Sequence, residues 1–372
     1  MQVSGVVQDV GSSRRAGVDP SPCTCEPLSP SLPPRNLLTL FHSPPCAMIS
    51  VMSPEIATPQ SEISPSLPSQ PDLSPFHNIP GLSNFRDIGG WSISCSHGPP
   101  HHVRKGIVFR GSDTNRITPE GEEQLRQLGI KTDFDLRSKQ QMEKTGGYKE
   151  MAGIERRWTP VFNDEQYTEE AARKRYEQYA GEGTEGIVTA FIEILTAGAP
   201  MFRTVLTHVL DSAVGASPPP AVFMHCTTGN NRTGVFISML LLLLGVAPAT
   251  IAHEYALSEA GLAHTRHVNV ERLLKKGAFQ EHGHEEAKRK CERMVGARKE
   301  SMEALLAEVE KIWQGPEGYF KAEVRLSDRE MERLRELFKE VCKRHEQVPR
   351  GVLSQQLNSQ SCHTGEVVVE EM

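Results

Sequence analysis

Cys226 and Arg232 are the two residues in this chain whose types and spacing point most directly to chemistry. They belong to the string HCTTGNNRTG at 225–234, which lies between a short apolar run and a long one. A loop at the start of a helix gathers backbone N–H groups and the positive end of the helix dipole around one anion. Such donors and a guanidinium favour the thiolate form of cysteine, which is the nucleophile. The pattern therefore predicts a thiolate that faces a bound oxyanion.

We expect the oxyanion bound by this loop to be phosphate. Arg232 offers a planar fork to two phosphate oxygens. The other expected phosphate-binding residues are Thr227, Thr228, Gly229, Asn230, Asn231 and Thr233. Attack by sulfur on phosphorus would give a thiophosphoryl intermediate that water hydrolyses, with Thr233 bonding the sulfur as it leaves and His225 orienting the loop from behind. The alternative interpretation of Cys226 is a buried, inert thiol.

The apolar pattern around this loop predicts the elements that position it. The run 221–224 is typical of a buried strand, and 233–245 is typical of a buried helix that is short for a membrane span. Further strands are expected at 106–110, 130–136 and 155–162. Further helices are expected at 119–128, 169–180, 186–196, 202–212, 248–260, 288–313 and 328–344. We expect an α/β fold with three layers and a central, mostly parallel sheet of four or five strands.

The reaction also needs a general acid, because an alkoxide or phenoxide leaves badly without a proton. Asp164 is the first candidate, since it lies on a polar loop before the helix at 169–180, which is polar nearly all round and is expected to form a flap. Asp135 is the second, at the carboxyl end of a strand, with a structural salt bridge as its alternative role. Arg86 and Asp87 either contribute to the phosphate site or form a local ion pair that braces their loop.

The string HCTTGNNRTG resembles the signature loop of the cysteine-based protein tyrosine phosphatase superfamily. Five other segments resemble the tyrosine/serine protein phosphatase family within it, namely NFRDIGG (84–90), VFRGSD (108–113), LGIKTDFDLRS (128–138), EYALS (254–258) and GARKESM (296–302). They follow the family's order over roughly residues 75–340. The resemblance implies a phosphatase of phosphotyrosine, or of phosphoserine and phosphothreonine, that acts through a cysteinyl-phosphate intermediate.

Two positions depart from the family's pattern. Asn230 and Asn231 stand where the family often has lysine and aspartate, which are linked to phosphoinositide handling and to proton donation. Asn231 cannot titrate, so the acid must come from elsewhere. A phospho-ligand binding protein with negligible turnover is therefore an alternative, as are phosphoinositide hydrolysis and, more remotely, a sulfur transferase or an arsenate reductase.

Composition limits the partners, cofactors and cellular compartment that we expect for this chain. The chain has 372 residues, a formal net charge of -6 and no dense basic run, so we expect neither nucleic acid nor a membrane as partner, and no transmembrane segment. The histidines at 264, 267, 282 and 284 have no metal-ligand spacing, so no metal site is expected. No cofactor is expected either, because sulfur and arginine would do the work that a metal does in other phosphatases. A catalytic thiolate favours a reducing compartment, the cytoplasm or the nucleus.

We expect a disordered Ser/Pro-rich segment at 1–74, a catalytic domain at 75–346 and a disordered tail at 347–372, with the oligomeric state open.

Overall fold

A computed structural model describes residues 75–94 and 100–341. The predictions about the segments 1–74 and 347–372 lie outside the described residues. Nearly all of the segment predicted to be the catalytic domain is described, including the whole loop between Cys226 and Arg232.

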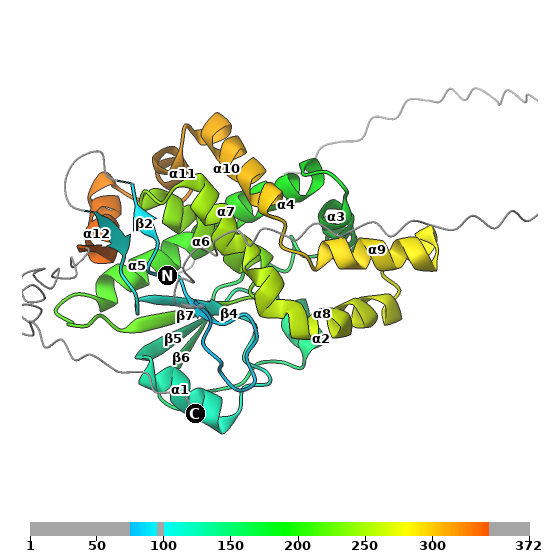
Figure 1. Ribbon diagram of the computed structural model, residues 1–372, viewed down its shortest axis with the longest axis horizontal. Coiled ribbons are helices and arrows are strands. Elements are labelled where there is room, and N and C mark those ends of the chain that lie inside the picture. Colours follow the sequence, from blue (N-terminus) through cyan, green and yellow to red (C-terminus); the bar gives the residue numbers. More distant parts are fainter. Residues whose placement is uncertain (1–74, 95–99, 342–372) are drawn as a thin grey trace, which may run out of the picture. The chain divides into compact units, whose positions relative to one another are not determined.

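A five-stranded sheet forms the centre of the fold, in the order β1-β4-β7-β5-β6 (Figure 1). Its strands are β1 (Arg86–Asp87), β4 (Val108–Gly111), β5 (Ile130–Asp135), β6 (Glu155–Trp158) and β7 (Ala221–His225). The last four are parallel to one another, and β1 pairs antiparallel with β4. Every residue of β7 is buried, as a central strand covered on both faces requires. The mostly parallel α/β fold predicted from the sequence is confirmed.

Helices cover both faces of this sheet, so the fold has three layers (Figure 1). On one face, Leu125 of α1 (Pro119–Gln127) packs in a cluster with Phe109 and Phe223. Val222 and Met224 belong to the larger cluster on the opposite face, because successive side chains of a strand alternate. The helices of that layer are α4 (Glu185–Ala197), α5 (Ala199–Ser212), α6 (Asn231–Leu243), α7 (Pro248–Ala256), α10 (Lys299–Trp313), α11 (Pro316–Ala322) and α12 (Asp328–Phe338). Among the described helices none is long and apolar enough to cross a membrane alone, and α4 with α5 meets that test only as a pair bent by 60°.

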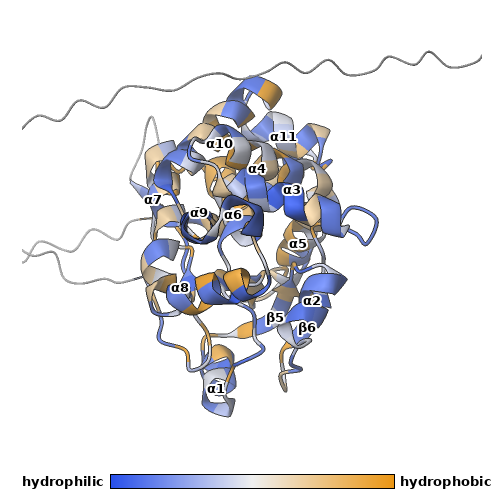
Figure 2. Ribbon diagram, turned by 90° about the vertical axis from the view of Figure 1, so that its right-hand side faces the viewer, coloured by the Kyte–Doolittle hydropathy of each residue, from blue (hydrophilic) through white to orange (hydrophobic). Residues whose placement is uncertain are grey.

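The remaining helices are α2 (Lys139–Thr145), α3 (Glu169–Ala180), α8 (Ser258–Lys275), η1 (Gln280–His282) and α9 (His284–Met294). Figure 2 shows α2 and α3 largely in hydrophilic colours. The prediction that α3 forms a solvated flap is wrong, however, because Ala172, Arg175 and Tyr179 are buried where α3 packs against α4 and α9. Helix α3 is therefore a packed wall of the fold.

Three predicted helix boundaries are wrong. The helix expected at 248–260 is two helices, α7 and α8, and α8 continues to Lys275. The helix expected at 288–313 is broken between α9 and α10, where the backbone bonds instead to Asn230 and Glu259. The last helix ends at Phe338, and β8 (Lys339–Val341) then pairs with β3 (His101–Val103). With β2 (Ser92–Ile93), these strands form a second sheet that was not predicted.

Candidate active site

The loop from Cys226 to Asn230 joins the buried strand β7 to the buried helix α6. Its turn depends on Gly229, which has a φ of 68°, a left-handed conformation that favours glycine. A Cβ atom at this position would also collide with the carbonyl oxygen of Gly111. The loop can therefore approach the end of β4 only with glycine at this position.

Donors behind the loop bind its carbonyl oxygens. Asn84 Nδ2 donates to Thr228 O at 3.1 Å. Arg110 Nη2 donates to Gly229 O at 2.6 Å and reaches Asn230 O at 3.3 Å. In a planar trans peptide the C=O and the following N–H point in opposite directions. Because the carbonyls face these donors, the N–H groups of the loop are free to face the other side, where an anion would bind.

A buried ion triad holds these donors in place. Glu254 of α7 accepts from Arg86 Nε at 2.8 Å and from Arg110 Nη1 at 2.7 Å, and all three side chains are at most 1% exposed. Burial and the neighbouring Arg110 lower the pKa of Arg86 to about 10, despite Glu254. Asp87 instead accepts backbone N–H groups of Gly89 and Gly106. The alternative of a local ion pair between Arg86 and Asp87 is wrong, because Arg86 pairs with Glu254 and Asp87 accepts backbone N–H groups. Through Glu254 and Arg110, Arg86 supports the loop at 226–230, which we call the phosphate loop, from behind.

The Cys226 thiol is placed for reaction as a thiolate. Burial alone would raise its pKa, but Arg232 and hydrogen bonds from Thr233 and from the backbone of Thr228 outweigh burial and lower the pKa to about 7. Thr233 Oγ1 has no oxygen or nitrogen partner in the described part of the chain, which leaves it for the sulfur. At neutral pH a large fraction of Cys226 is therefore in its nucleophilic form.

Arg232 is held by Gln141, which was not predicted as a site residue from the sequence. Gln141 Oε1 accepts a hydrogen bond from Arg232 Nη1. The same oxygen accepts from the backbone N of Ser138, and the Ser138 hydroxyl accepts from the N–H of Gln141, which makes a capping box at the start of α2. The spacing Ser138-x-x-Gln141 is the sequence signal that indicates this helix start.

His225 lies beneath the loop, fully buried. Its Nε2 is 3.1 Å from Asp133 Oδ1, and its Nδ1 donates to Cys226 O at 2.9 Å. Burial disfavours the charged imidazole, but the charges of Asp133 and Asp135 outweigh burial and raise the pKa of His225 to about 9. A protonated ring donates to the loop carbonyl from Nδ1 and forms an ion pair with Asp133 on its other side.

Neither carboxyl group proposed from the sequence is placed to donate a proton. Asp135 is fully buried, and its Oδ2 lies 2.7 Å from both Arg137 Nη2 and Arg156 Nη2. Burial opposes ionisation, but His225 and these arginines hold the pKa of Asp135 well below its usual range. Asp135 therefore stays ionised and has the structural role. Asp164 is exposed and does not line the cavity at Cys226.

A cavity of about 150 Å³ opens at Cys226, and we call it the Cys226 cavity. It brings together the predicted Thr227, Thr228, Asn230, Asn231 and Arg232. Its aromatic wall consists of Phe162, Tyr167, Tyr176 and Tyr179, from α3 and the preceding loop. Among the described residues Glu259 is the one carboxylate in its wall, and it is bound to Arg266 and to the N–H of Ala297. The cavity therefore combines residues of the loop with an aromatic wall, and no unengaged carboxyl group of the described residues lines it.

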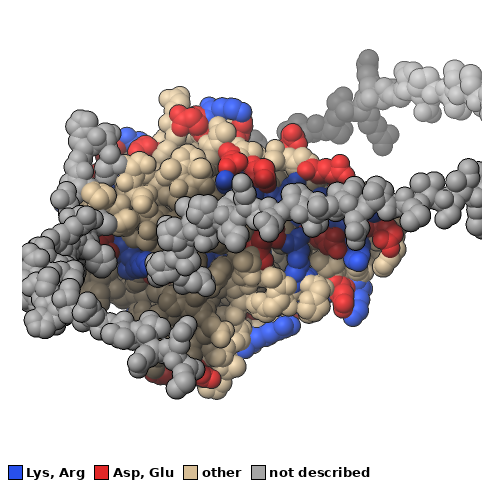
Figure 3. Space-filling model, viewed as in Figure 1, with Lys and Arg blue, Asp and Glu red and all other residues tan. Residues whose placement is uncertain are grey.

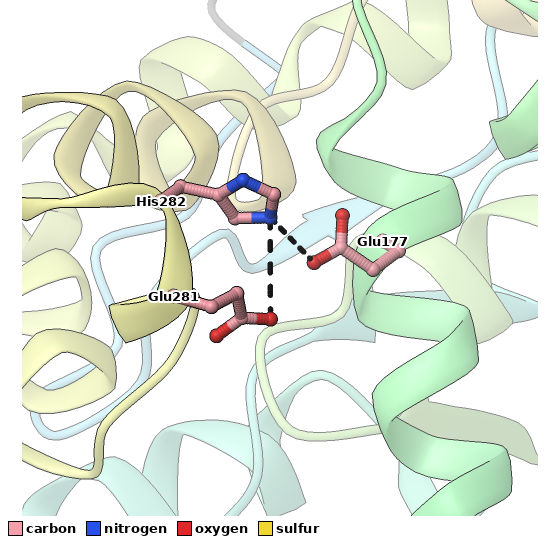
Figure 4. A group of neighbouring side chains, drawn as sticks. All are labelled: Glu177, Glu281 and His282. Atoms are coloured by element: carbon pink, nitrogen blue, oxygen red, sulfur yellow. Dashed lines mark ion pairs between the residues drawn. The ribbon is translucent and has the colours of Figure 1, made fainter. Parts of the chain in front are cut away.

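One group of side chains has the composition of a metal site, formed by Glu177, Glu281 and His282 (Figure 4). His282 Nε2 lies 3.4 Å from Glu177 and 3.9 Å from Glu281. Lys290 Nζ already binds Glu177 at 2.6 Å, and Arg173 binds Glu281 at 2.9 Å. Basic and acidic side chains lie interspersed over the surface shown in Figure 3. We interpret the group as an ion-pair cluster that links α3 to η1 and α9.

Residues 77–340 match the model of the tyrosine phosphatase family. The chain belongs to the tyrosine phosphatase family. It is a phosphatase, and so a hydrolase, as the names of its relatives also indicate. The "Triple specificity protein phosphatase PtpB" of Mycobacterium tuberculosis is 26% identical over 205 residues, which covers 50% of this chain and 71% of the relative. A "Tyrosine-protein phosphatase" of Nostoc commune is 26% identical over 234 residues, which covers 61% and 72%.

Among solved structures, TpbA of P. aeruginosa aligns with 58% of this phosphatase and 96% of its own chain. The two are 17% identical, and the TM-score is 0.23. At that TM-score the match adds nothing to the family assignment, which depends on the sequence match over 77–340.

Proposed function

We propose that this phosphatase hydrolyses phosphotyrosine in proteins through a cysteinyl-phosphate intermediate. The observation that carries the proposal is the Cys226 thiol, whose pKa is lowered to about 7 and which lies in a loop built to bind an oxyanion, next to the guanidinium of Arg232. A thiolate in an anion-binding loop is the arrangement that nucleophilic attack on a phosphate monoester needs.

In the first step the Cys226 thiolate attacks phosphorus, an S–P bond forms, and the P–O bond to the substrate breaks. The leaving oxygen takes the electron pair of that bond and a proton from water. Arg232 and the loop N–H groups bind the three other oxygens and stabilise the charge that develops on them. In the second step water attacks phosphorus, inorganic phosphate leaves, and sulfur takes back its electron pair as a thiolate. Thr233 Oγ1 is placed to stabilise the departing sulfur.

Tyrosine is the favoured phosphorylated residue because of the leaving group. The one carboxylate in the described wall of the Cys226 cavity, Glu259, is engaged by Arg266. Without a strong general acid, departure of a phenoxide is much easier than departure of the alkoxide of serine or threonine, since tyrosine has a pKa of about 10. The aromatic wall of Phe162, Tyr167, Tyr176 and Tyr179 supports the same choice, because it offers ring contacts to a phosphotyrosine side chain.

A binding protein with negligible turnover is the second candidate, favoured by Asn231 and by the engagement of Glu259. Hydrolysis of an aryl phosphate and of a phosphotyrosine peptide, in the presence of a chelator, separates the two functions. We expect turnover by the wild type and none by the Cys226→Ser variant. Binding of the peptide that inorganic phosphate competes, without turnover by the wild type, would reject the proposed enzyme and favour the binding protein.

A further inference from the structure

Arg272 of α8 differs from the other arginines around the Cys226 cavity in its partners. Arg232 is bound by Gln141, Arg175 by Glu193, and Arg266 by Glu259. Arg272 lines the same cavity and is half-buried, but its guanidinium makes no hydrogen bond or ion pair to any part of the chain that the structure describes. Holding a half-buried guanidinium without a partner costs free energy, and binding of an anion recovers it.

Arg272 also lines a second cavity of about 140 Å³, which we call the adjoining cavity. The two cavities share Thr227, Thr228, Leu262, Asn269 and Arg272. They are therefore neighbours across the first residues of the phosphate loop. A ligand with one phosphate at Cys226 can extend a second group past Thr227 and Thr228 into the adjoining cavity.

The walls of the adjoining cavity are suited to an anion. Hydroxyl and amide side chains line it, from Ser83, Ser112, Asn115, Thr145, Thr265 and Asn269. Arg116 lies at the same cavity, is exposed, and has no ion-pair or hydrogen-bond partner for its side chain among the described residues. Two guanidinium groups that have no ion-pair partner among the described residues therefore line one polar space next to the candidate active site.

Asp113 is the carboxylate in this wall and opposes anion binding. Its Oδ1 accepts the N–H of Asn115 at 3.2 Å, and its Oδ2 lies 3.8 Å from Arg137 Nη1. Arg137 lies closer to Asp135, at 2.7 Å, so it offsets only part of the charge of Asp113. Arg116 and Arg272 together still outweigh the single carboxylate of Asp113, which leaves a net positive charge in the wall. Planar guanidinium groups with hydroxyl donors nearby are the usual partners of a phosphate monoester.

We propose that Arg272, with Arg116, binds a second phosphate monoester of the same substrate, so that the preferred substrate is a peptide phosphorylated on tyrosine and on a neighbouring residue. This inference rests on the proposed function and names its substrate class. A peptide is favoured over an inositol lipid because the aromatic wall at Cys226 suits the ring of phosphotyrosine. Arg272 is a specificity residue in this proposal, since its role is to bind the second phosphate and not the one that is hydrolysed.

The test measures binding of two fluorescent peptides of the same sequence, one with phosphotyrosine alone and one with a second phosphate on a neighbouring serine. The protein is the full chain with Cys226→Ser, which prevents turnover during the measurement. A charge-assisted hydrogen bond between the Arg272 guanidinium and the second phosphate should make the doubly phosphorylated peptide bind about tenfold more tightly. We expect Arg272→Gln to reduce that ratio to near one, and Arg116→Gln to reduce it partly.

The matched control is Arg329→Gln, which removes the same charge from an exposed position on α12 outside both cavities. It should leave the ratio of the two affinities unchanged. The inference would be overturned if the two peptides bind with equal affinity while Arg272 is present. It would also be overturned if Arg329→Gln lowers the affinity ratio as much as Arg272→Gln does, or if neither peptide binds. The inference would likewise be overturned if binding to vesicles that contain a bisphosphorylated inositol lipid depends on Arg272 while binding to the peptides does not. The proposed function is tested separately, by turnover of an aryl phosphate by the wild type.

Discussion

Arg110 binds Glu254 at 2.7 Å through one guanidinium nitrogen and the Gly229 carbonyl at 2.6 Å through another. A side chain from β4 thus ties a buried carboxylate of α7 to the turn of the phosphate loop. Arg86 completes the arrangement from β1 through the other oxygen of Glu254. The loop that presents Cys226 is therefore fixed from behind by charges that never meet the substrate.

Replacing Glu254 with Gln should destabilise the fold strongly. The change leaves two buried guanidinium groups with a neutral partner, and breaking a buried ion pair typically costs about 3–5 kcal/mol. The free energy of unfolding in urea measures this loss. The control is Glu332→Gln, an exposed residue with a surface pair to Arg335, which should stay within about 0.5 kcal/mol of the wild type. Equal stability of the Glu254 variant and the wild type would contradict a structural role for the triad.

The reactivity of Cys226 should depend on pH with a midpoint of about 7. The thiolate is the reactive form, so alkylation by iodoacetamide should be slow below this pH and reach a plateau above it. Thr233→Ala removes a hydroxyl that stabilises the thiolate and should move the midpoint to higher pH. Buried Cys291, whose pKa burial raises, should react slowly over the same range and serves as the internal comparison. A midpoint near that of an ordinary thiol, 9.0, would contradict the electrostatic description of the site.

Gln141 should control activity through the position of Arg232. We expect Gln141→Ala to lower kcat/KM for an aryl phosphate by about tenfold, since a hydrogen bond to a charged group is worth about 1.5–3 kcal/mol. Gln141→Glu keeps the acceptor but adds a negative charge beside Arg232, so it should raise the pKa of Cys226. The pH dependence of alkylation separates the two variants. An unchanged kcat/KM in the alanine variant would show that Arg232 does not need this partner.

Turnover should depend steeply on the leaving group. With Glu259 engaged, aryl phosphates that carry electron-withdrawing groups should react faster than phenyl phosphate, and an alkyl phosphate should react slowest. Asp164→Asn should not change this order, because Asp164 is exposed and outside the Cys226 cavity. A flat dependence would show that a proton donor is present. Asp113, whose pKa burial raises and which lines the adjoining cavity, would then be the first carboxyl group to replace.

The sequence predicted those parts of the fold that depend on residues close together in the chain, namely apolar runs and helix caps. The apolar run before Cys226 forms β7, and the run after Arg232 forms α6. Thr118 and Ser327 cap α1 and α12 as their spacing indicates. Each of these features depends on residues within a few positions of one another, so a single sequence is sufficient to predict it.

Features that depend on distant partners were not predictable in this way. The helix predicted at 248–260 would end just before Gly261, but Gly261 lies inside α8, where a Cβ atom would collide with Asn84. Its lack of a side chain serves a close contact rather than a helix end. Asp135 lies at the expected edge of the sheet, but Arg137 and Arg156 neutralise it. The ion pair between Arg86 and Glu254 joins residues 168 positions apart, so no pattern of neighbouring residues indicates it.

Gln141 belongs to α2, a helix of seven residues that buries none of them. Short helices are marginal by themselves, and such segments open at a lower free energy than the core. The hydrogen bond that positions Arg232 therefore depends on a short, unburied helix, while Cys226 lies between the buried β7 and α6. Mild denaturant should abolish catalysis while the sheet is still intact, and amide protons at 139–145 should exchange well before those of α6. The enzyme would then have an inactive state with a native core.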